Sequence, residues 1–448
     1  NGEFIQVHPT AIPGSDKLRL MSESARGEGG RVWVPRQPQD PRDPTEIPES
    51  ERYYFLEDRY PTYGNLVPRD IATREIFNVC VNEGLSVETE RQCVYLDLTH
   101  IDRRELDRKL SGILEIYEKF QGVDPREVPM KIFPAVHYSM GGLWVDYERT
   151  AAGGLAPGSP RMQATNIPRL YAIGECDYQY HGANRLGANS LLSCIFAGLY
   201  LGPGLVNLFK SRQEGLASDQ PASLYESALQ QCQRRHTSLQ KRTGVGENPY
   251  ALHRELGDLM TRTATVVRQN DPLRDAYARV CELEQRAQHC SLSDVGDWSN
   301  QNVVFTKALQ DMLPLAKVIL LGAWRRDECR GAHFKPAFEM PGLTATDAIE
   351  RRRQAEAWCD RFEENNRKWL KSTIARCTPA DPELTYEEVD TTLIPPRPRL
   401  YGLVGADAID ECWKERHRRA APQTGAPGTA PIGKGAESAE APKPAALV

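Results

Sequence analysis

The sequence predicts an α/β fold followed by an all-α region, and two patterns carry that prediction. In the middle third, short apolar runs bounded by glycine or proline are typical of buried strands. Three such runs occur, at 130–136, 143–146 and 170–173. From Ser211 onward, apolar residues recur at helical spacing. Short connections between such helices favour antiparallel packing.

The first third is less regular and contains two predicted helices and a proline-rich insert. Residues 70–82 and 103–120 carry apolar positions at helical spacing. Five prolines lie between Pro35 and Ser50. Because proline lacks the backbone N–H and fixes its φ, this density excludes a helix or an interior strand. We therefore expect a mobile, solvated surface loop at 35–50.

The longest uncharged stretch runs from Leu186 to Phe209 and is long enough to span a bilayer. Its asparagines, serines and glycines favour a different structure. We predict a buried helix over 190–201 that ends at Gly202-Pro203-Gly204.

Four further helices are predicted beyond residue 249. They cover 250–269, a segment that starts at Asp271-Pro272, 302–324, and 346 to about 374. From about Arg419 the chain is rich in alanine, proline, glycine and threonine, with almost no large apolar residue. Such a tail is expected to be disordered.

Composition narrows the classes of function. The chain has 448 residues, enough for roughly three domains. Its 56 Lys and Arg against 61 Asp and Glu give a net charge of −5, without the basic excess of a nucleic-acid binder. The eleven cysteines include no CxxC pair, which argues against a disulfide framework, a zinc ribbon or an iron–sulfur cluster. We therefore expect no bound metal, no nucleic-acid partner and a reducing compartment.

Five segments concentrate histidine, arginine, hydroxyl groups and glycine. They are HPT from His8, SESARGEGG from Ser22, PRD from Pro68, HYSMGG from His137 and HGANRLGANSLL from His181. Paired His and Arg bind an anion through charge-assisted hydrogen bonds, and the Arg fork matches a carboxylate. Each residue taken alone is more often structural. Arg185 is the most suggestive, because burying a lone cation is costly without an anionic partner.

In this order and spacing, these segments together resemble the flavoproteins of the succinate dehydrogenase and fumarate reductase family. The motifs NLVPRDIATREI, PAVHYSMGG and YAIGE add to the resemblance, which covers residues 2 to 405. The sequence looks closest to the Gram-positive-like group that pairs with a single diheme cytochrome b anchor. L-Aspartate oxidase shares parts of the same motifs.

The resemblance implies a partial flavin-binding domain with an α+β capping domain, then a helical-bundle domain and a C-terminal domain. The expected boundaries are 1–130 for the capping domain, with its insert at 35–50, and 131–210 for the C-terminal part of the FAD-binding domain. The helical domain would occupy 211–330, the C-terminal domain 331–418 and a disordered tail 419–448.

The resemblance also implies roles for ten residues. His8, His137 and Arg185 match residues that hold the two substrate carboxylates, and Ser22 stands where many members have a substrate-binding threonine. Arg69 matches the catalytic proton-transfer arginine, and Glu23 and Arg26 match the relay that connects it to solvent. Glu175, Ser190 and Leu191 match flavin contacts.

The implied activity is oxidation of succinate to fumarate by hydride transfer to FAD, with electrons passed to an iron–sulfur subunit. A cytochrome b membrane anchor would hold the assembly, so that this chain lies peripherally on the cytoplasmic face of the inner membrane. The family's flavin-linking histidine and its Gly-rich G-x-G-x-x-G fingerprint are not found in this sequence. We therefore expect the C-terminal portion of a larger flavoprotein, binding flavin weakly or not at all by itself.

Three alternatives stay open. A fumarate reductase flavoprotein would run the same chemistry in reverse. L-Aspartate oxidase would need no iron–sulfur partner, although the long helical region and residues 392–399 look more like the dehydrogenase. A non-catalytic remnant, acting as an assembly or binding module, would keep the domains without the activity.

Overall fold

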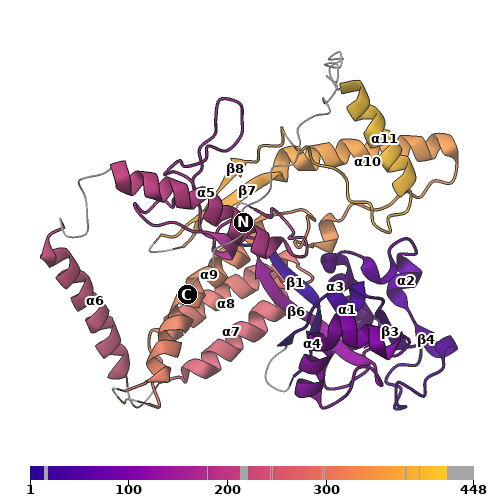
Figure 1. The fold of residues 1–448 in the computed structure, drawn as a ribbon, viewed down its shortest axis with the longest axis horizontal. Helices are drawn as coiled ribbons and strands as arrows, with labels where there is room; N and C mark the ends of the chain where they lie inside the picture. The colour runs from indigo at the N-terminus through magenta and orange to yellow at the C-terminus, as the bar shows by residue number, and fades with distance from the viewer. Residues whose placement is uncertain are drawn as a thin grey trace, which may run out of the picture.

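The computed structural model describes residues 1–420 except 15–18, 179, 212–219, 243, 245, 295, 297, 379–380 and 393. Its N-terminal part is built on an antiparallel sheet of six strands in the order β2-β1-β6-β5-β3-β4 (Figure 1). The strands are β1 (Ile5–Ile12), β2 (Arg19–Leu20), β3 (Arg31–Pro35), β4 (Arg52–Tyr53), β5 (Val94–Asp97) and β6 (Met130–Ser139). The predicted strand at 130–136 is confirmed as the first part of β6.

The pairing of β1 with β6 contains an irregularity at the HPT segment. His8 pairs with Ala135, but the next registered pair is Ala11 with Phe133. Pro9 lies in this interval and has no N–H to donate to the ladder, so a bulge forms there. The bulge places the histidine of β1 beside the central strand of the sheet.

Helices pack against this sheet and close a core. They are α1 (Ser24–Gly27), α2 (Phe55–Arg59), α3 (Arg69–Phe77) and α4 (Arg103–Gln121), and α3 continues as a π-helical turn at Asn78–Asn82. Asp102 caps α4 by accepting from the N–H groups of Arg104 and Glu105. Gly122 ends it with a φ of 70°. The helices predicted at 70–82 and 103–120 are thus confirmed.

The proline-rich insert is irregular over residues 36–48, as predicted. A 3-10 turn follows at Glu49–Glu51. Ile47 is nevertheless buried and packs with Trp33 and Tyr95. The insert therefore covers part of one face of the sheet, over β3 and β5, in addition to contacting solvent.

Three helices form a second core in the middle of the chain: α7 (Pro249–Ala264), α8 (Asn270–Ala287) and α9 (Gln301–Arg325). The helix predicted at 302–324 is confirmed. Two predicted ends are wrong: α7 stops at Ala264 instead of residue 269, and α8 is capped by Gln269, not Asp271. Pro272 fits the third position of α8, because the first N–H groups of a helix have no partner inside it.

A fourth helix, α6 (Ala222–Gln240), extends along the edge of the molecule (Figure 1). Leu239, at its last turn, is its one buried residue among those described.

The C-terminal part contains α10 (Ala348–Trp369), the hairpin of β7 (Lys371–Arg376) and β8 (Glu383–Glu388), and α11 (Ala406–Ala420). Asp347 caps α10 as predicted. The predicted extension of this helix to residue 374 is wrong, because 371–376 pairs with 383–388, a partner that local periodicity cannot reveal. The tail predicted from residue 419 is helical to Ala420, and 421–448 lie outside the described residues.

Two predicted strands in the middle third are wrong. Residues 143–146 and 170–173 make only isolated bridges, Leu143 with Asp177 and Ala164 with Tyr171. Leu143 and Leu170 are exposed, although Val145 and Ala172 beside them are buried. Each of these two apolar runs is buried on one side only, and the sequence alone does not distinguish such a run from a buried strand.

The helix predicted at 190–201 is α5 (Asn189–Ser211), and it is neither as short nor as buried as predicted. It continues through Pro203, and Gly204 serves for packing, since a Cβ there would lie 2.6 Å from the carbonyl oxygen of Ser159. Most of its large apolar side chains are exposed. By length and composition α5 could cross a membrane, a test that core helices of soluble proteins also pass.

One buried arginine ties the three parts together. Arg326, at the end of α9, is fully buried and bonds Glu3 at 2.7 Å and Glu328 at 2.8 Å. It also donates to the carbonyl oxygens of Trp369 and Lys371 and to the hydroxyl of Thr373. Because these partners come from the N-terminus, α10 and β7, one guanidinium joins all three.

We expect Arg326→Met to lower the free energy of unfolding by about 3–5 kcal/mol, because it removes the fully buried cation shared by two buried carboxylates. Glu328 would keep only Arg330, and Glu3 only the N-terminal ammonium at 3.9 Å. Urea unfolding would measure this. Arg325→Met removes the neighbouring, exposed arginine and is the matched control. Equal midpoints for the two variants would contradict the role given to Arg326.

Candidate dicarboxylate site

Two histidines face each other across β1 and β6. The rings of His8 and His137 meet edge to face with centroids 5.2 Å apart. The Nδ1 of His8 accepts from the backbone N–H of Thr10 at 3.1 Å, so Nε2 carries the ring proton. Burial and the nearby Arg69 lower the pKa of His8 to about 2. His8 is therefore a neutral hydrogen-bond donor.

His137 is held by Arg185. An Nη2 of Arg185 lies 2.7 Å from the Nε2 of His137. Since a guanidinium can only donate, this nitrogen accepts, and Nδ1 of His137 keeps the proton. Burial and the Arg185 charge lower the pKa of His137 to about 4. Both histidines are thus uncharged near neutral pH.

Arg185 is a buried cation without an acidic partner. Its side chain lies over the ring of Tyr138, with the guanidinium carbon 4.3 Å from the ring centre, and only 3% of the residue is exposed. Its Nε has no hydrogen-bond partner, and among the described residues no carboxylate lies within ion-pair distance. Burial and the Arg69 charge lower its pKa. A buried guanidinium in this state favours an anion.

Arg69 begins α3 and is the centre of a chain of ionic contacts. It bonds Oε2 of Glu23 through Nε at 2.8 Å and Nη2 at 2.6 Å. The other oxygen of Glu23 accepts from Arg26 at 3.2 Å. Arg26 is buried and donates to the carbonyl oxygens of Asn65 and Val67. Glu23 itself is partly exposed, so this series of ionic contacts reaches solvent.

Two residues that sequence reasoning missed connect these groups. Gln6 is buried, accepts from Arg69 at 3.2 Å, and donates to Asn184 and to the carbonyl oxygen of Arg185. Asp70 accepts from Asn184, Arg74 and Arg399. The position of Gln6 two residues before His8, on the same face of β1, was a signal that could have identified it.

The glycine of the 185–189 segment allows a close approach. A Cβ on Gly187 would lie 3.2 Å from the Glu23 carboxylate and 3.6 Å from the Arg69 guanidinium. The loop that carries Arg185 therefore passes directly over the ion pair.

The remaining predicted residues lie apart from this group. Ser22 is exposed, and its hydroxyl donates to Ser24 instead of reaching the histidines. Glu175 accepts from the N–H of Ser139 at the end of β6. Ser190 and Leu191 begin α5, where Leu191 is 73% exposed. The structure thus brings together His8, His137, Arg185, Arg69, Glu23 and Arg26, and places the predicted flavin contacts on an adjoining surface.

Comparison with known proteins shows the family of the chain. The model of the FAD binding domain family matches residues 1–191, and that of the fumarate reductase flavoprotein C-terminal family matches 253–401. The succinate dehydrogenase flavoprotein subunit of Bacillus subtilis is 49% identical over 403 residues, which are 90% of this chain and 60% of that protein. The chain belongs to the succinate dehydrogenase and fumarate reductase flavoprotein family.

More distant members agree. The fumarate reductase flavoprotein subunit of Escherichia coli is 28% identical over 91% of this chain and 60% of its own length. A solved variant of the Escherichia coli quinol fumarate reductase superposes with a TM-score of 0.69 and 27% identity, over 90% of this chain and 61% of that one. The predicted family and fold are confirmed. The chain spans about 60% of the length of these curated relatives.

The low pKa of His137 makes stability depend on pH. An unfolded histidine takes up its proton near pH 6.5, whereas folded His137 does so only near pH 4. Below pH 6.5 the unfolded chain therefore binds more protons, and stability falls as the pH drops towards 4.

We expect His137→Gln to reduce this loss of stability between pH 6.5 and 4, measured by urea unfolding at each pH. His236→Gln, on the exposed face of α6, is the control and should follow the wild-type curve. A His137→Gln profile parallel to the wild type would disprove the assignment of a half-buried, neutral imidazole.

Proposed function

We propose that this chain supplies the dicarboxylate-binding and proton-transfer groups of a succinate dehydrogenase flavoprotein. The observation that carries the proposal is Arg185, a buried guanidinium whose described neighbours include no ion-paired carboxylate. The 49% identity to a succinate dehydrogenase subunit, against 28% to a fumarate reductase subunit, favours succinate oxidation over fumarate reduction.

The two carboxylates of succinate would be bound in different ways. Arg185 would bind one carboxylate through two charge-assisted hydrogen bonds, and the neutral His8 and His137 would donate hydrogen bonds to the other. Holding both carboxylates fixes the carbon–carbon bond between them. Ser22 lies outside this cluster, and its hydroxyl would contribute only after its loop moves inward.

The proton would leave through the ionic chain. Arg69 is held from two sides, by Glu23 and by Gln6, which aims its guanidinium at the space beside the histidines. A guanidinium stays protonated in nearly all settings. Arg69 therefore serves best by handing a proton to Glu23 as it receives another, and Arg26 fixes Glu23 in place for that exchange.

FAD fits the adjoining surface. The turn at Gly174–Cys176, which carries Glu175, packs against α5, and α5 exposes Leu191 and Leu192 near its start. A Cβ on Gly142 would lie 2.5 Å from the carbonyl oxygen of Cys176. Such close backbone contact and apolar exposure suit one wall of a pocket for a flat ring system. When bound, FAD would accept the hydride that succinate loses.

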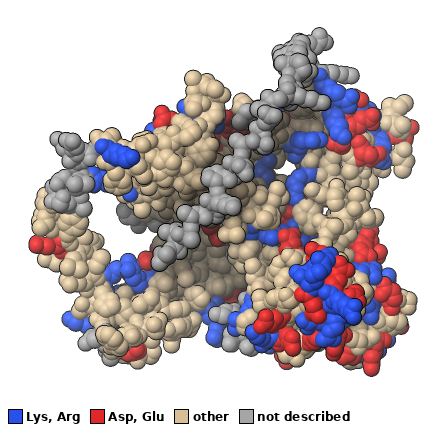
Figure 2. Space-filling model, viewed as in Figure 1, with Lys and Arg blue, Asp and Glu red and all other residues tan. Residues whose placement is uncertain are grey.

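The exposed apolar side of α5 supports a larger assembly. Leu192, Ile195 and Leu199 all project from it, and this part of the surface is largely free of charged side chains (Figure 2). A group of exposed large apolar side chains usually marks a contact with another polypeptide. We propose that it packs against another segment of the assembled flavoprotein, and that an iron–sulfur subunit and a cytochrome b anchor complete a complex on the cytoplasmic face of the membrane.

Replacing Arg185 tests substrate binding. Arg185→Gln should weaken binding of malonate by about 100-fold, since it removes the buried charge that the anion would neutralise. Isothermal titration calorimetry would measure the affinity. Arg161→Gln, which removes an exposed arginine paired with Asp146, should bind as the wild type does. Unchanged affinity in Arg185→Gln would refute the site.

Replacing Arg69 tests proton transfer. In the assembled flavoprotein, Arg69→Lys should lower succinate oxidation at least about 1,000-fold, because an ammonium cannot bond Glu23 and Gln6 in the same geometry. Malonate affinity should change less than about threefold. Turnover within tenfold of the wild type would reject the role of Arg69.

Co-purification of an iron–sulfur subunit would separate the dehydrogenase from L-aspartate oxidase, and inactivity of the assembled wild type would favour a non-catalytic module.

A further inference from the structure

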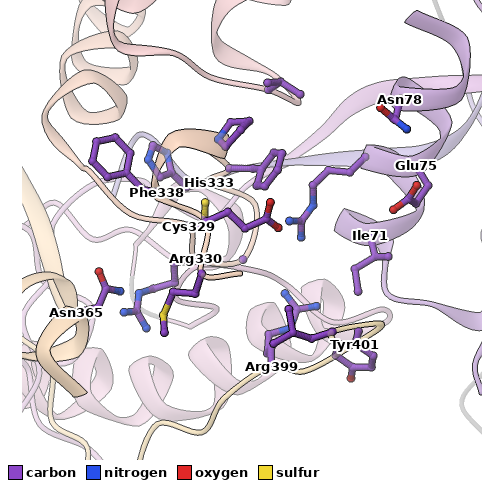
Figure 3. Close-up of a pocket in the computed structure, with 18 of the residues that line it drawn as sticks. Ile71, Glu75, Asn78, Cys329, Arg330, His333, Phe338, Asn365, Arg399 and Tyr401 are labelled. Carbon is purple, nitrogen blue, oxygen red and sulfur yellow. The ribbon is translucent and has the colours of Figure 1, made fainter. Parts of the chain in front are cut away.

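A cavity of about 520 Å³ lies against α3, between this helix and the C-terminal part of the chain (Figure 3). It is bounded by α3, by the loop at 329–340, by α10 and by the segment around Arg399 and Tyr401. Phe338 and Tyr401 lie at opposite ends of it in the close-up. Neither Arg69 nor Arg185 lines it, so it is separate from the site described above.

Aromatic side chains line the cavity at several places, and two of them lie beside arginines, Phe334 against Arg74 and Tyr401 against Arg399. Phe334, Phe338, Trp358, Phe362 and Tyr401 all contribute to the lining. Trp358 is 7% exposed, and its indole N–H has no hydrogen-bond partner. A buried N–H without an acceptor is costly, and a ligand oxygen in the cavity would relieve that cost.

Four arginines also line the cavity, at positions 74, 330, 397 and 399, together with the acidic Glu75 and Glu339. Arg330 is paired with Glu328, and Arg397 lies 3.8 Å from Asp410. Glu75 is already paired with Arg59. Arg74 and Arg399 share the single carboxylate of Asp70, which leaves one positive charge uncompensated by that contact.

We propose that this cavity binds an aromatic carboxylate, a flat apolar ring system with one anionic group. Its volume lies within the usual range for small-molecule sites, and such sites combine an apolar lining with few polar groups. The rings would stack on the aromatic side chains of the lining, and the carboxylate would meet Arg74 and Arg399. A short aliphatic dicarboxylate lacks the apolar body that this lining requires.

The experiment titrates 2-naphthoate into the full chain by isothermal titration calorimetry. We expect saturable one-to-one binding that saturating succinate does not displace. The neutral analogue 2-naphthalenemethanol should bind at least about tenfold more weakly, because it brings no charge to the arginines.

Two variants locate the site. Arg74→Gln should weaken 2-naphthoate binding about tenfold while still offering Asp70 a donor, and Phe338→Ala should weaken it to a similar extent by removing a stacking surface. Phe338 is partly exposed, so its loss leaves the core intact. Arg235→Gln, which breaks an exposed pair with Asp311 on α6, is the matched control and should bind normally.

Three results would overturn the proposal. They are an absence of saturable binding in the millimolar range, displacement of 2-naphthoate by succinate, and equal affinity in wild type, Arg74→Gln and Phe338→Ala. Equal affinity for the neutral analogue would contradict recognition of an anion.

Discussion

The carboxylate of Asp70 is the contact on which the proposed dicarboxylate site depends. It lies in the first turn of α3 and bonds Arg74 of the same helix, Arg399 from the C-terminal segment and Asn184 from the Arg185 loop. Burial would raise the pKa of Asp70, but Arg399 and Arg74 outweigh this and lower it. Asp70 is therefore ionised near neutral pH. Its two carboxylate oxygens join α3, the loop that carries Arg185 and the segment that carries Arg399.

This contact matters because the site gathers positive charge. Arg69 occupies the first residue of α3, where the helix dipole disfavours a cation. Arg185 and Arg26 are buried nearby, and each lowers or shares in lowering the proton affinity of its neighbours. Glu23 and Asp70 offset part of this repulsion. The positive charge that these carboxylates do not offset favours binding of an anion. Arg185, which carries part of this charge, is fixed by packing and not by an acidic partner among the described residues.

Much of the fold could be predicted from the sequence because the signals are local. The helices at 103–121 and 301–325 show their apolar stripes and their capping residues directly. Local signals fail where the partner is remote: the strand at 371–376 needs 383–388, and the strands expected at 143–146 and 170–173 find only single bridges. The exposure of α5 could not be predicted for the same reason. The apolar composition of a helix indicates that it packs against another surface, but it does not identify that surface.

The site followed a similar division. The histidines and arginines were identifiable because their motifs are distinctive, and the structure places five of them together with Glu23. Gln6 and Asp70 were overlooked because an amide and a helix-start aspartate look ordinary in a sequence. Ser22 was selected by motif position, yet its hydroxyl bonds a neighbour in its own turn. Contacts between segments separated by more than 100 residues, such as Asp70 with Asn184, are visible only after folding.

The bulge at Pro9 also fixes the handedness of the site. Side chains alternate between the two faces of a sheet, so a strand that slips by one residue turns every side chain over. Pro9 interrupts the ladder directly after His8, and the register resumes only at Ala11. The interval at Pro9 is one of two irregularities in the β1–β6 register, and the other lies between Gln6 and Val7. Chains that lost Pro9 could keep the same composition, the same core volume and the same strands, and still present the wrong face of β1 to the ligand.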